Sequence, residues 1–401
     1  MMGAVMGMLL LGTAIAAADE PLPEVTGITL SEVMITSSMD GTEQPVIVGV
    51  PDSYQPGTPT PLLVGLHTWS ADYKQRAKPY GMQAATRGWL MVLPNFRGPN
   101  KSGPTAAQAG GSLLAQRDIV DARAFMIENY SVDPGGIYLT GDSGGGHMTL
   151  LMAGKHPDLW TAVAAWCPVT DFRDWWALDT GYSRNIEVVT GGSFGDSPEV
   201  DFEYARRSPR TFMTNLAHLP VLFGHGDGDP VIPVDQSWAT YRELKRVPAH
   251  RTVFYSWGAG HTGLQGFGLD WCVEQTRSLP PLPELHLVTD ESKSYAWADL
   301  QMADETRLAT ADIVRGEDAL SVATSNLSGL ALQMNALPLP EGGTTVAVRN
   351  DLPLTLTLEG IPAGATMTCE GGWATVQQQS DEALVLSVQP SEEARSLRLA
   401  W

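Results

Sequence analysis

The chain has 401 residues, which is enough for one large domain and a smaller one. Acidic residues outnumber basic residues by 45 to 25, and the formal net charge is −20. A surface of this sign repels phosphate backbones and anionic membranes, so the composition argues against a nucleic-acid-binding protein.

The N-terminal sequence MMGAVMGMLLLGTAIAAADE has the pattern of a secretory signal peptide. Its apolar run, from Val5 to Ala17, is too short to cross a bilayer comfortably, and small residues follow it before Asp19. We therefore expect a signal peptide over residues 1–18. The protein should be secreted or periplasmic, without a membrane anchor.

Between residues 25 and 279, short apolar runs alternate with helical patterns. The first two runs, VMITSS and PVIVGV, are joined by the turn MDGTEQ, and the later runs are continuously apolar, as in strands covered on both faces. This alternation predicts a doubly wound α/β domain with a mostly parallel sheet. The later expected strands are 61–66, 90–94, 137–140, 162–166, 219–225 and 252–257, and the expected helices are 115–130, 145–155, 234–245 and 264–279.

A proline-rich stretch, SLPPLPELH, follows this domain, and we place a linker at residues 280–286. Beyond it, short runs with period-two alternation and regularly spaced turn residues predict a small β-sandwich over residues 287–401. Within the first domain, residues 171–215 form an insertion that we expect to act as a cap over the site.

The sequence GDSGG, Gly141–Gly145, follows an expected strand and opens an expected helix. In this context G-x-S-x-G marks a nucleophile elbow, a sharp turn that exposes the hydroxyl of Ser143 and that requires very small neighbours. A phosphate-binding loop is the alternative. It is disfavoured because neither a following Lys-Ser/Thr pair nor G-x-G-x-x-G is present at this turn.

A serine nucleophile of this kind needs an acid and a histidine later in the chain, in that order. The run LPVLFGHGDGDPVIP offers Asp227 and Asp229 after a late strand, and TVFYSWGAGHTG places His261 after the last strand. His261 would accept the proton of the serine, and the acid would hold the imidazole in the correct tautomer. All three residues precede the linker, so we expect the first domain alone to act on small soluble esters.

The oxyanion of an acyl-transfer reaction needs two hydrogen-bond donors. We expect them to be the backbone N–H groups of Gly144 and of Trp69, which lies in the turn HTWS after strand 61–66, with Thr68 as the alternative to Trp69. Aromatic residues of the insertion either bind substrate or pack the cap onto the sheet. The candidate substrate-binding residues are Thr68, Trp175, Trp176 and Tyr182.

The sequence gives no sign of a metal, a cofactor or a disulfide framework. The cysteines are widely spaced and odd in number, without a CxxC or Cys/His cluster. The carboxylates of DGDP lack the further ligands of a calcium loop. The three cysteines, which we expect to be buried thiols, are Cys167, Cys272 and Cys369.

Two longer stretches resemble the catalytic domains of prolyl-oligopeptidase-type enzymes. They are DIVDARAFMIENYSVDPGGIYLTGDSGGGHMTLLMAGKHPDLW and RRSPRTFMTNLAHLPVLFGHGDGDPVIP. In that family the pattern H-G-x-x-D-x-x-V-P marks the catalytic acid, so the resemblance implies Asp229 rather than Asp227, with Ile232 where valine is usual. The resemblance covers about residues 46–277. It implies an α/β-hydrolase fold and serine hydrolase activity.

Peptidases of this type carry a large β-propeller before the hydrolase domain, whereas about forty residues precede the hydrolase pattern here. The difference favours a secreted esterase that cleaves carboxylic esters through an acyl-enzyme. Acetyl or aromatic acyl esters of polysaccharides are the candidate substrates. The alternatives are a propeller-free peptidase acting on short peptides and a carbohydrate- or wall-binding protein in which the C-terminal domain carries the binding function.

Overall fold

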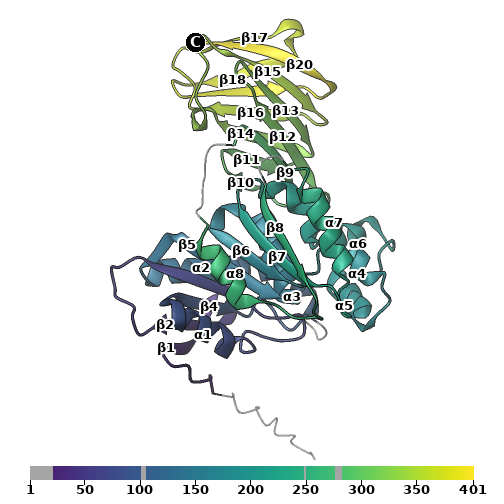
Figure 1. Cartoon of the computed structure of the whole chain (residues 1–401). Helices are drawn as coiled ribbons and strands as arrows, with labels where there is room; N and C mark the ends of the chain where they lie inside the picture. The colour runs from purple at the N-terminus through teal and green to yellow at the C-terminus, as the bar shows by residue number, and fades with distance from the viewer. Residues whose placement is uncertain (1–20, 101–104, 248–249, 276–281) are drawn as a thin grey trace, which may run out of the picture.

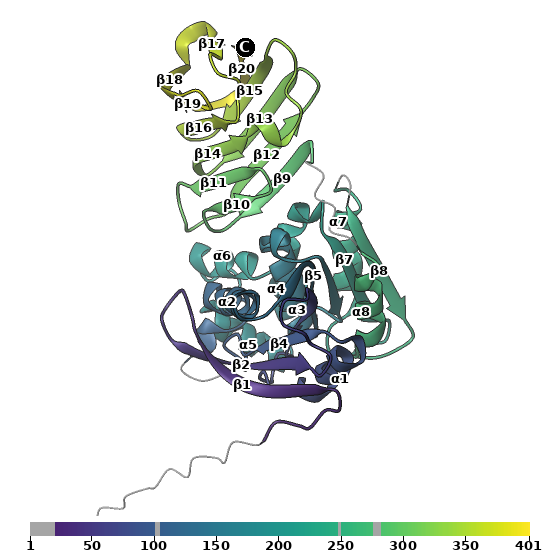
Figure 2. The ribbon, with the colours of Figure 1, turned by 90° about the vertical axis from the view of Figure 1, so that its left-hand side faces the viewer.

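The computed structural model of the protein describes residues 21–100, 105–247, 250–275 and 282–401. An α/β domain forms one end of the molecule, and a β-domain stands on it with the C-terminus near its far tip (Figures 1 and 2). The expected signal peptide lies outside the described residues. Of the helices in the described ranges, none is long and apolar enough to cross a membrane.

The α/β domain contains one eight-stranded sheet in the order β1-β2-β4-β3-β5-β6-β7-β8. The first two strands pair antiparallel, and the pairs from β4 to β8 are parallel. The carboxyl ends of the parallel strands therefore meet at one edge of the sheet. The strands are β1 (Ile28–Thr36), β2 (Glu43–Pro51), β3 (Thr60–Leu66), β4 (Leu90–Pro94), β5 (Val132–Asp142), β6 (Ala162–Trp166), β7 (Pro220–Gly226) and β8 (Arg251–Trp257).

Helices cover both faces of this sheet because successive side chains of a strand point to opposite sides. Leu62 and Val64 pack in a core with α2, α3 and α7, whereas Leu63 packs in a second core with α1 and α8. The sheet is thus buried on both faces, as the continuous apolar strands predict. The helices are α1 (Ala77–Arg87), α2 (Leu113–Asn129), α3 (Gly144–Lys155), α7 (Val234–Leu244) and α8 (Gln265–Val273), with short turns η1 (Ala106–Gln108) and η2 (Pro157–Leu159).

The insertion between β6 and β7 forms a small helical cap with an aromatic core of its own. Trp175, Tyr204 and Ile186 are fully buried there, and Trp69 of the α/β domain packs into the same cluster. The cap therefore packs against the edge of the sheet at which β3 ends. Its helices are α4 (Phe172–Trp176), α5 (Gly181–Thr190), α6 (Pro198–Arg206) and η3 (Pro209–Leu216).

The β-domain consists of two six-stranded sheets whose inward-facing residues share one core. The first strand begins earlier than the sequence suggests. Residues 284–286, which the expected linker includes, pair with β12 and belong to β9. The strands are β9 (Glu284–Thr289), β10 (Lys293–Tyr295), β11 (Ala298–Met302), β12 (Ala309–Arg315), β13 (Ala319–Ser325), β14 (Leu327–Gln333), β15 (Thr344–Asn350), β16 (Leu354–Glu359), β17 (Thr366–Thr368), β18 (Ala374–Gln379), β19 (Ala383–Val388) and β20 (Ser391–Ala400), with turns η4 (Met334–Ala336) and η5 (Glu370–Gly372).

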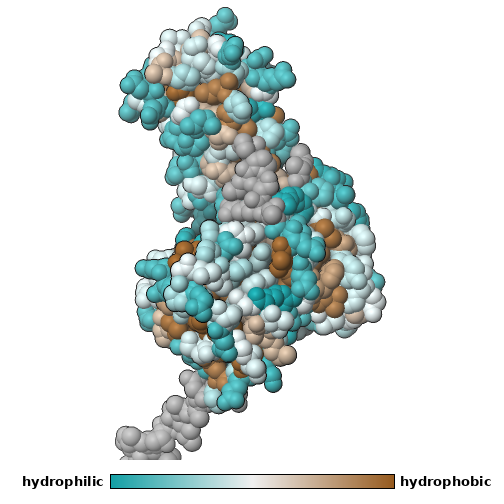
Figure 3. All heavy atoms as spheres, turned by 60° about the vertical axis from the view of Figure 1, so that its left-hand side comes forward, coloured by the Kyte–Doolittle hydropathy of each residue, from teal (hydrophilic) through white to brown (hydrophobic). Residues whose placement is uncertain are grey.

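The surface shown in Figure 3 is mainly hydrophilic on both domains, with apolar residues in separate small groups. On this face the apolar residues therefore form no single large patch of the kind that marks an extended interaction surface.

Candidate active site

Ser143 occupies a strained turn between β5 and α3. Its backbone has φ 55° and ψ −118°, a conformation that residues with a Cβ rarely adopt. The turn is held on both sides, because the N–H of Ser143 donates to the carbonyl of Trp166 at 2.8 Å and its carbonyl accepts from the N–H of His147 at 2.8 Å. A Cβ on Gly145 would lie 2.6 Å from the carbonyl oxygen of Leu66, so the turn requires glycine there. The geometry is that of a nucleophile elbow.

The turn after β3 approaches the first residue of α3 very closely. A Cβ on Gly144 would lie 2.4 Å from the backbone nitrogen of Trp69. The backbone N–H of Thr68, by contrast, donates to Oε1 of Gln75 at 3.0 Å. Of the two expected donors on this turn, Trp69 is thus the one whose nitrogen lies beside Gly144.

Asp229 and His261 come together from the ends of β7 and β8. Nδ1 of His261 donates to Oδ2 of Asp229 at 2.7 Å. The N–H groups of Val231 and Ile232 donate to the other carboxylate oxygen at 2.8 and 3.0 Å. Burial raises the pKa of the Asp229 carboxyl, but hydrogen bonds from His225 and His261 outweigh it and hold the pKa below its usual range. Asp229 is therefore an ionised acid that orients His261.

His225 is a second histidine on Asp229, which the sequence shows only as part of the H-G-x-x-D pattern. Its Nδ1 lies 2.7 Å from the hydroxyl of Ser237, and its Nε2 lies 3.1 Å from Oδ2 of Asp229. Nε2 also lies 2.8 Å from the carbonyl of Ile232. Both of these neighbours are acceptors, so the proton is on Nε2, is shared between them, and Ser237 donates to Nδ1. Asp227, the other sequence candidate, is exposed and lies on the turn itself.

Ser143 and His261 line the same pocket, which has a volume of about 290 Å³. Within the described ranges no hydrogen bond joins their side chains, as is common before substrate binds. Thr68 and Tyr182, two of the candidate substrate-binding residues, and Trp69, the expected oxyanion donor, also lie in the wall. The remaining lining residues are Ser70, Arg76, Asp142, Cys167, Thr262, Gly263 and Gln265.

A polar group that the sequence analysis missed lies beside Ser143. Asp142 forms an ion pair with Arg76 through one carboxylate oxygen and accepts from Nε2 of Gln265 at 2.6 Å through the other. The Arg76 side chain keeps 28 % of its surface exposed, whereas that of Asp142 keeps 5 %. Asp142 stands inside GDSGG, but its partners come from distant segments, so spacing along the chain does not reveal them.

The structure does not bring Trp175 and Trp176 into the pocket wall, which corrects the expectation that they bind substrate. Trp175 is 1 % exposed and packs between Trp69 and Tyr182, with ring centroids 5.3 and 4.9 Å away. Trp176 packs against Tyr204 at 6.1 Å, inside the cap. Large apolar rings gain most from burial, and here the cap interior provides it.

One group of side chains has the composition of a metal site. Ligand atoms of Cys167, Asp229 and His261 lie within 4.8 Å of one another. The facing atoms of Asp229 and His261 are already joined by their hydrogen bond, and burial raises the pKa of the Cys167 thiol. A protonated thiol is a poor ligand, so these residues do not fit a metal.

The fold and the site together define a serine hydrolase with an α/β-hydrolase fold. A model of the prolyl oligopeptidase family matches residues 76–269. The catalytic domain of this chain belongs to that family.

Curated relatives include acylamino-acid-releasing enzyme 1 of Oryza sativa subsp. japonica, which is 26 % identical over 176 residues, 40 % of this chain and 22 % of the relative. The acylamino-acid-releasing enzyme of Rattus norvegicus is 25 % identical over 173 residues, 39 % of this chain and 22 % of the relative. The chain thus spans only about a fifth of these relatives. Acetylxylan esterase A of Emericella nidulans is 28 % identical over 116 residues, 27 % of this chain and 37 % of the relative.

Among solved structures, an acylaminoacyl peptidase of Pyrococcus horikoshii superposes with a TM-score of 0.52 at 23 % identity. The match covers 62 % of this chain and 40 % of that chain. At this level of identity the likeness shows the fold alone.

Proposed function

We propose that this protein hydrolyses carboxylic esters through an acyl-enzyme on Ser143, with His261 as general base and Asp229 as the acid that orients it. The observation that carries the proposal is the strained Ser143 turn in one pocket with His261, whose Nδ1 is bonded to Asp229. The N-terminal signal pattern supports action outside the cytoplasm, on small esters or acylated polysaccharides.

The reaction has two halves. Oγ of Ser143 attacks the ester carbonyl while Nε2 of His261 accepts its proton, and the N–H groups of Gly144 and Trp69 stabilise the oxyanion. The intermediate collapses, the alcohol leaves with the proton from His261, and the acyl group stays on Ser143. Water, deprotonated by His261, then attacks the acyl carbonyl. The bond to Oγ of Ser143 breaks, His261 returns the proton to Oγ, and the carboxylic acid is released.

The charge in the pocket supports an uncharged substrate. Asp142 and Arg76 neutralise each other, and Gln265 occupies the second oxygen of Asp142. Asp142 and Arg76 are the only described lining residues outside the proposed triad that carry formal charges. A free peptide terminus would therefore find no unpaired opposite charge, whereas an ester can use the hydroxyl and amide groups of the wall. The partial similarity to an acetylxylan esterase points the same way.

Release of acylated amino acids from peptides is the second candidate, since several relatives carry the name acylamino-acid-releasing enzyme. Such a substrate also has a blocked, uncharged acyl end. The difference lies in the leaving group, because an amine must be protonated as it departs whereas an alkoxide is the better leaving group.

The test is a comparison of the p-nitrophenyl ester and the p-nitroanilide of acetyl-alanine, which share one acyl group, with acetylated xylan and methyl ferulate as further esters. We expect kcat/KM for the ester to exceed that for the anilide by far, and S143A to lose both activities. Efficient cleavage of the anilide or of acetylated peptides, with weak cleavage of every ester, would establish the peptidase instead.

A further inference from the structure

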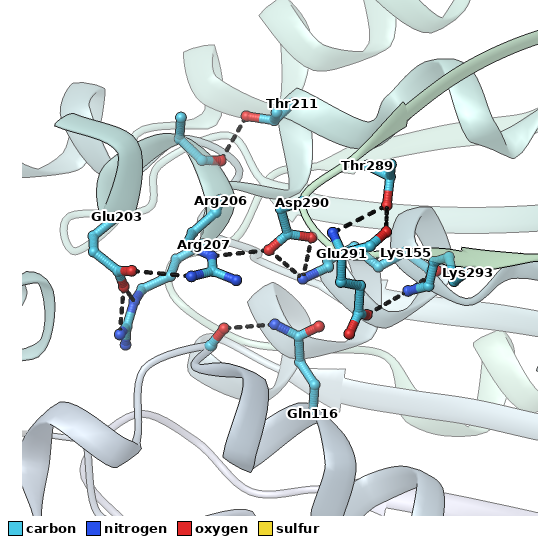
Figure 4. Close-up of polar contacts among 12 residues, drawn as sticks. Gln116, Lys155, Glu203, Arg206, Arg207, Thr211, Thr289, Asp290, Glu291 and Lys293 are labelled. Atoms are coloured by element: carbon cyan, nitrogen blue, oxygen red, sulfur yellow. Dashed lines mark hydrogen bonds and ion pairs between the residues drawn. The ribbon is translucent and has the colours of Figure 1, made fainter. Parts of the chain in front are cut away.

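The β-domain contacts the far end of the helix that carries the nucleophile turn. Helix α3 begins directly after Ser143 and ends at Lys155, whose side chain is 0 % exposed. Nζ of Lys155 lies 2.7 and 2.8 Å from the two carboxylate oxygens of Asp290, which follows β9 and is equally buried (Figure 4). A buried amino group of this kind depends on its carboxylate, because an unpaired charge inside a protein is very unfavourable.

The same turn of the β-domain also binds the last backbone carbonyl of α3. Nζ of Lys293 donates to the carbonyl of Lys155 at 2.9 Å. It also pairs with Glu291 at 2.6 Å (Figure 4). The final carbonyls of a helix have no partner within the helix, so an external cation stabilises this end. Asn215 of η3 adds a bridge, because its amide donates to the carbonyls of Gly154 and Val288 at 2.7 and 2.9 Å.

Asp290 also reaches the cap. Nε of Arg206, at the end of α6, donates to Oδ2 of Asp290 at 2.9 Å (Figure 4). The next residue, Arg207, accepts from Nε2 of His147 through its carbonyl at 2.7 Å. His147 lies in the first turn of α3 and is fully buried.

The contacts of His147 extend to the expected oxyanion turn. Its ring stacks on Phe172 of the cap at a centroid distance of 4.7 Å and meets the ring of Trp69 edge-on at 6.4 Å. One carboxylate of the β-domain thus holds the C-terminal end of α3 directly. Through Arg206 and Arg207 it also holds the residue beside the N-terminal end, where Ser143 and Gly144 lie.

We propose that Asp290 is a positioning residue for the reaction at Ser143, and that the β-domain fixes the nucleophile helix and the cap in their reactive arrangement. We call Lys155, Arg206, Asp290, Glu291 and Lys293 the Asp290 network. None of its residues lines the Ser143 pocket. The network therefore acts on the orientation of reacting groups rather than on substrate contact. The proposal rests on Ser143 being the nucleophile but not on the choice between ester and peptide.

The test uses the full chain and a fluorophosphonate probe, which requires only attack by Ser143. In K155M/D290N both members of the buried pair lose their charge together, and Arg206 retains Glu203, 3.3 Å away, as its partner. D312N is the control for the change at Asp290, because it makes the same Asp-to-Asn change at an exposed hydrogen-bonded pair of the β-domain, between Asp312 and His286. The maximal labelling rate, the half-saturating probe concentration and the final labelled fraction are measured for each protein.

We expect the maximal labelling rate of K155M/D290N to fall about tenfold, because small misplacements of reacting groups are costly. The half-saturating concentration should stay within twofold, and D312N should match the wild type. A purely structural role would lower the labelled fraction and the melting temperature but leave the rate of the folded fraction unchanged, and this result would overturn the proposal. Absence of labelling in the wild type would instead refute Ser143 as a nucleophile.

If K155M/D290N does not fold, E291Q/K293M decides the question. This variant is also balanced in charge. It removes the bond to the carbonyl of Lys155, the Lys293–Glu291 ion pair and the contact of Lys293 with the ring of Tyr295, and it leaves Lys155 paired with Asp290. We expect its maximal labelling rate to fall at least twofold. A rate equal to that of the wild type would contradict the positioning role.

Discussion

At the scale of single residues, Asp229 and Asp227 lie two positions apart and have opposite surroundings. Asp229 is buried and accepts bonds from His261, His225 and two backbone N–H groups, whereas the side chain of Asp227 faces solvent. Two aspartates that are close in sequence therefore have different roles, because only Asp229 contacts His261. The family pattern separates the two residues, but composition and spacing do not.

We expect D229N to lower kcat about 10⁴-fold, because His261 loses the partner that fixes its tautomer. D227N should stay within twofold of the wild type. Steady-state kinetics on p-nitrophenyl acetate, with melting temperatures to verify folding, compares the two variants. Equal losses, or a larger loss in D227N, would refute the assignment of the acid.

His147 predicts a pH dependence of stability. Burial lowers the pKa of His147 to about 4, whereas an unfolded histidine titrates near 6.5. Between these values the unfolded chain binds the extra proton, so folding becomes less favourable as the pH falls. This term reduces the free energy of unfolding by about 2 kcal/mol between pH 7.5 and pH 5.

The variant H147Q removes the titration and retains an N–H donor for the carbonyl of Arg207. Urea unfolding at pH 7.5 and pH 5 gives the free energy of unfolding at each pH. The decrease in this free energy on acidification should be smaller for H147Q than for the wild type, by about 2 kcal/mol. Other buried histidines, such as His67 and His156, contribute equally to both proteins and cancel in the difference. If the free energy of unfolding decreased equally in both proteins, the pKa of His147 in the folded protein would not be lowered.

At the scale of elements, the strand, turn and helix around Ser143 agree closely with the prediction because the apolar pattern and the glycines act together. Other elements differ for local reasons. Helix α1 was not expected, since Pro79 and Gly81 weaken its helical pattern, and tertiary packing of Tyr80 overrides that weakness. Strand β5 begins at Val132, earlier than the apolar run that starts at Ile137.

The expected helix over 264–279 is shorter in the structure. Helix α8 ends at Val273, and residues 276–279 lie outside the described ranges. The cap shows the limit of sequence patterns most clearly. The sequence shows its aromatic residues, but which rings face the pocket depends on how the short helices of the cap pack together.

The close approach of α3 to the turn after β3 gives a prediction at this scale. G144A should abolish detectable turnover, because the new methyl group would lie 2.4 Å from the nitrogen of Trp69 and would push the two expected oxyanion donors apart. Loss of oxyanion stabilisation alone costs about 10²–10³ in kcat.

G181A is the matched control, since a Cβ on Gly181 at the start of α5 meets no atom within 4 Å. Its activity and melting temperature should equal those of the wild type. If G144A retained more than a tenth of the wild-type kcat, Gly144 would not border the oxyanion site.

At the scale of the whole molecule, the β-domain is joined to the α/β domain by buried charges and not by the linker alone. The sequence suggests an independent tail because a proline-rich stretch separates two different patterns. It cannot show that Asp290 meets Lys155, 135 residues earlier. Contacts between buried charges that are far apart in sequence leave no local signal.

This contact argues against the expectation that the first domain acts alone, which stays untested. A chain that ends at Pro283 loses Asp290 and Lys293 together with the β-domain around them, so the ion pair of Lys155, the bond to its carbonyl and the bond from Asn215 to Val288 all disappear. We expect this truncated chain to be insoluble or to unfold at a markedly lower temperature than the full chain. A soluble truncated chain with an unchanged melting temperature would show that the interface adds nothing to stability.

The central claim is that Ser143 is the nucleophile of a serine hydrolase. Its most direct test is mass spectrometry of the full chain after reaction with a fluorophosphonate, followed by mapping of the modified peptide. We predict one adduct per chain, located on Ser143, with complete loss of hydrolytic activity and no adduct in S143A. An adduct on another residue, or an S143A protein that still hydrolyses the substrates of the wild type, would contradict the account.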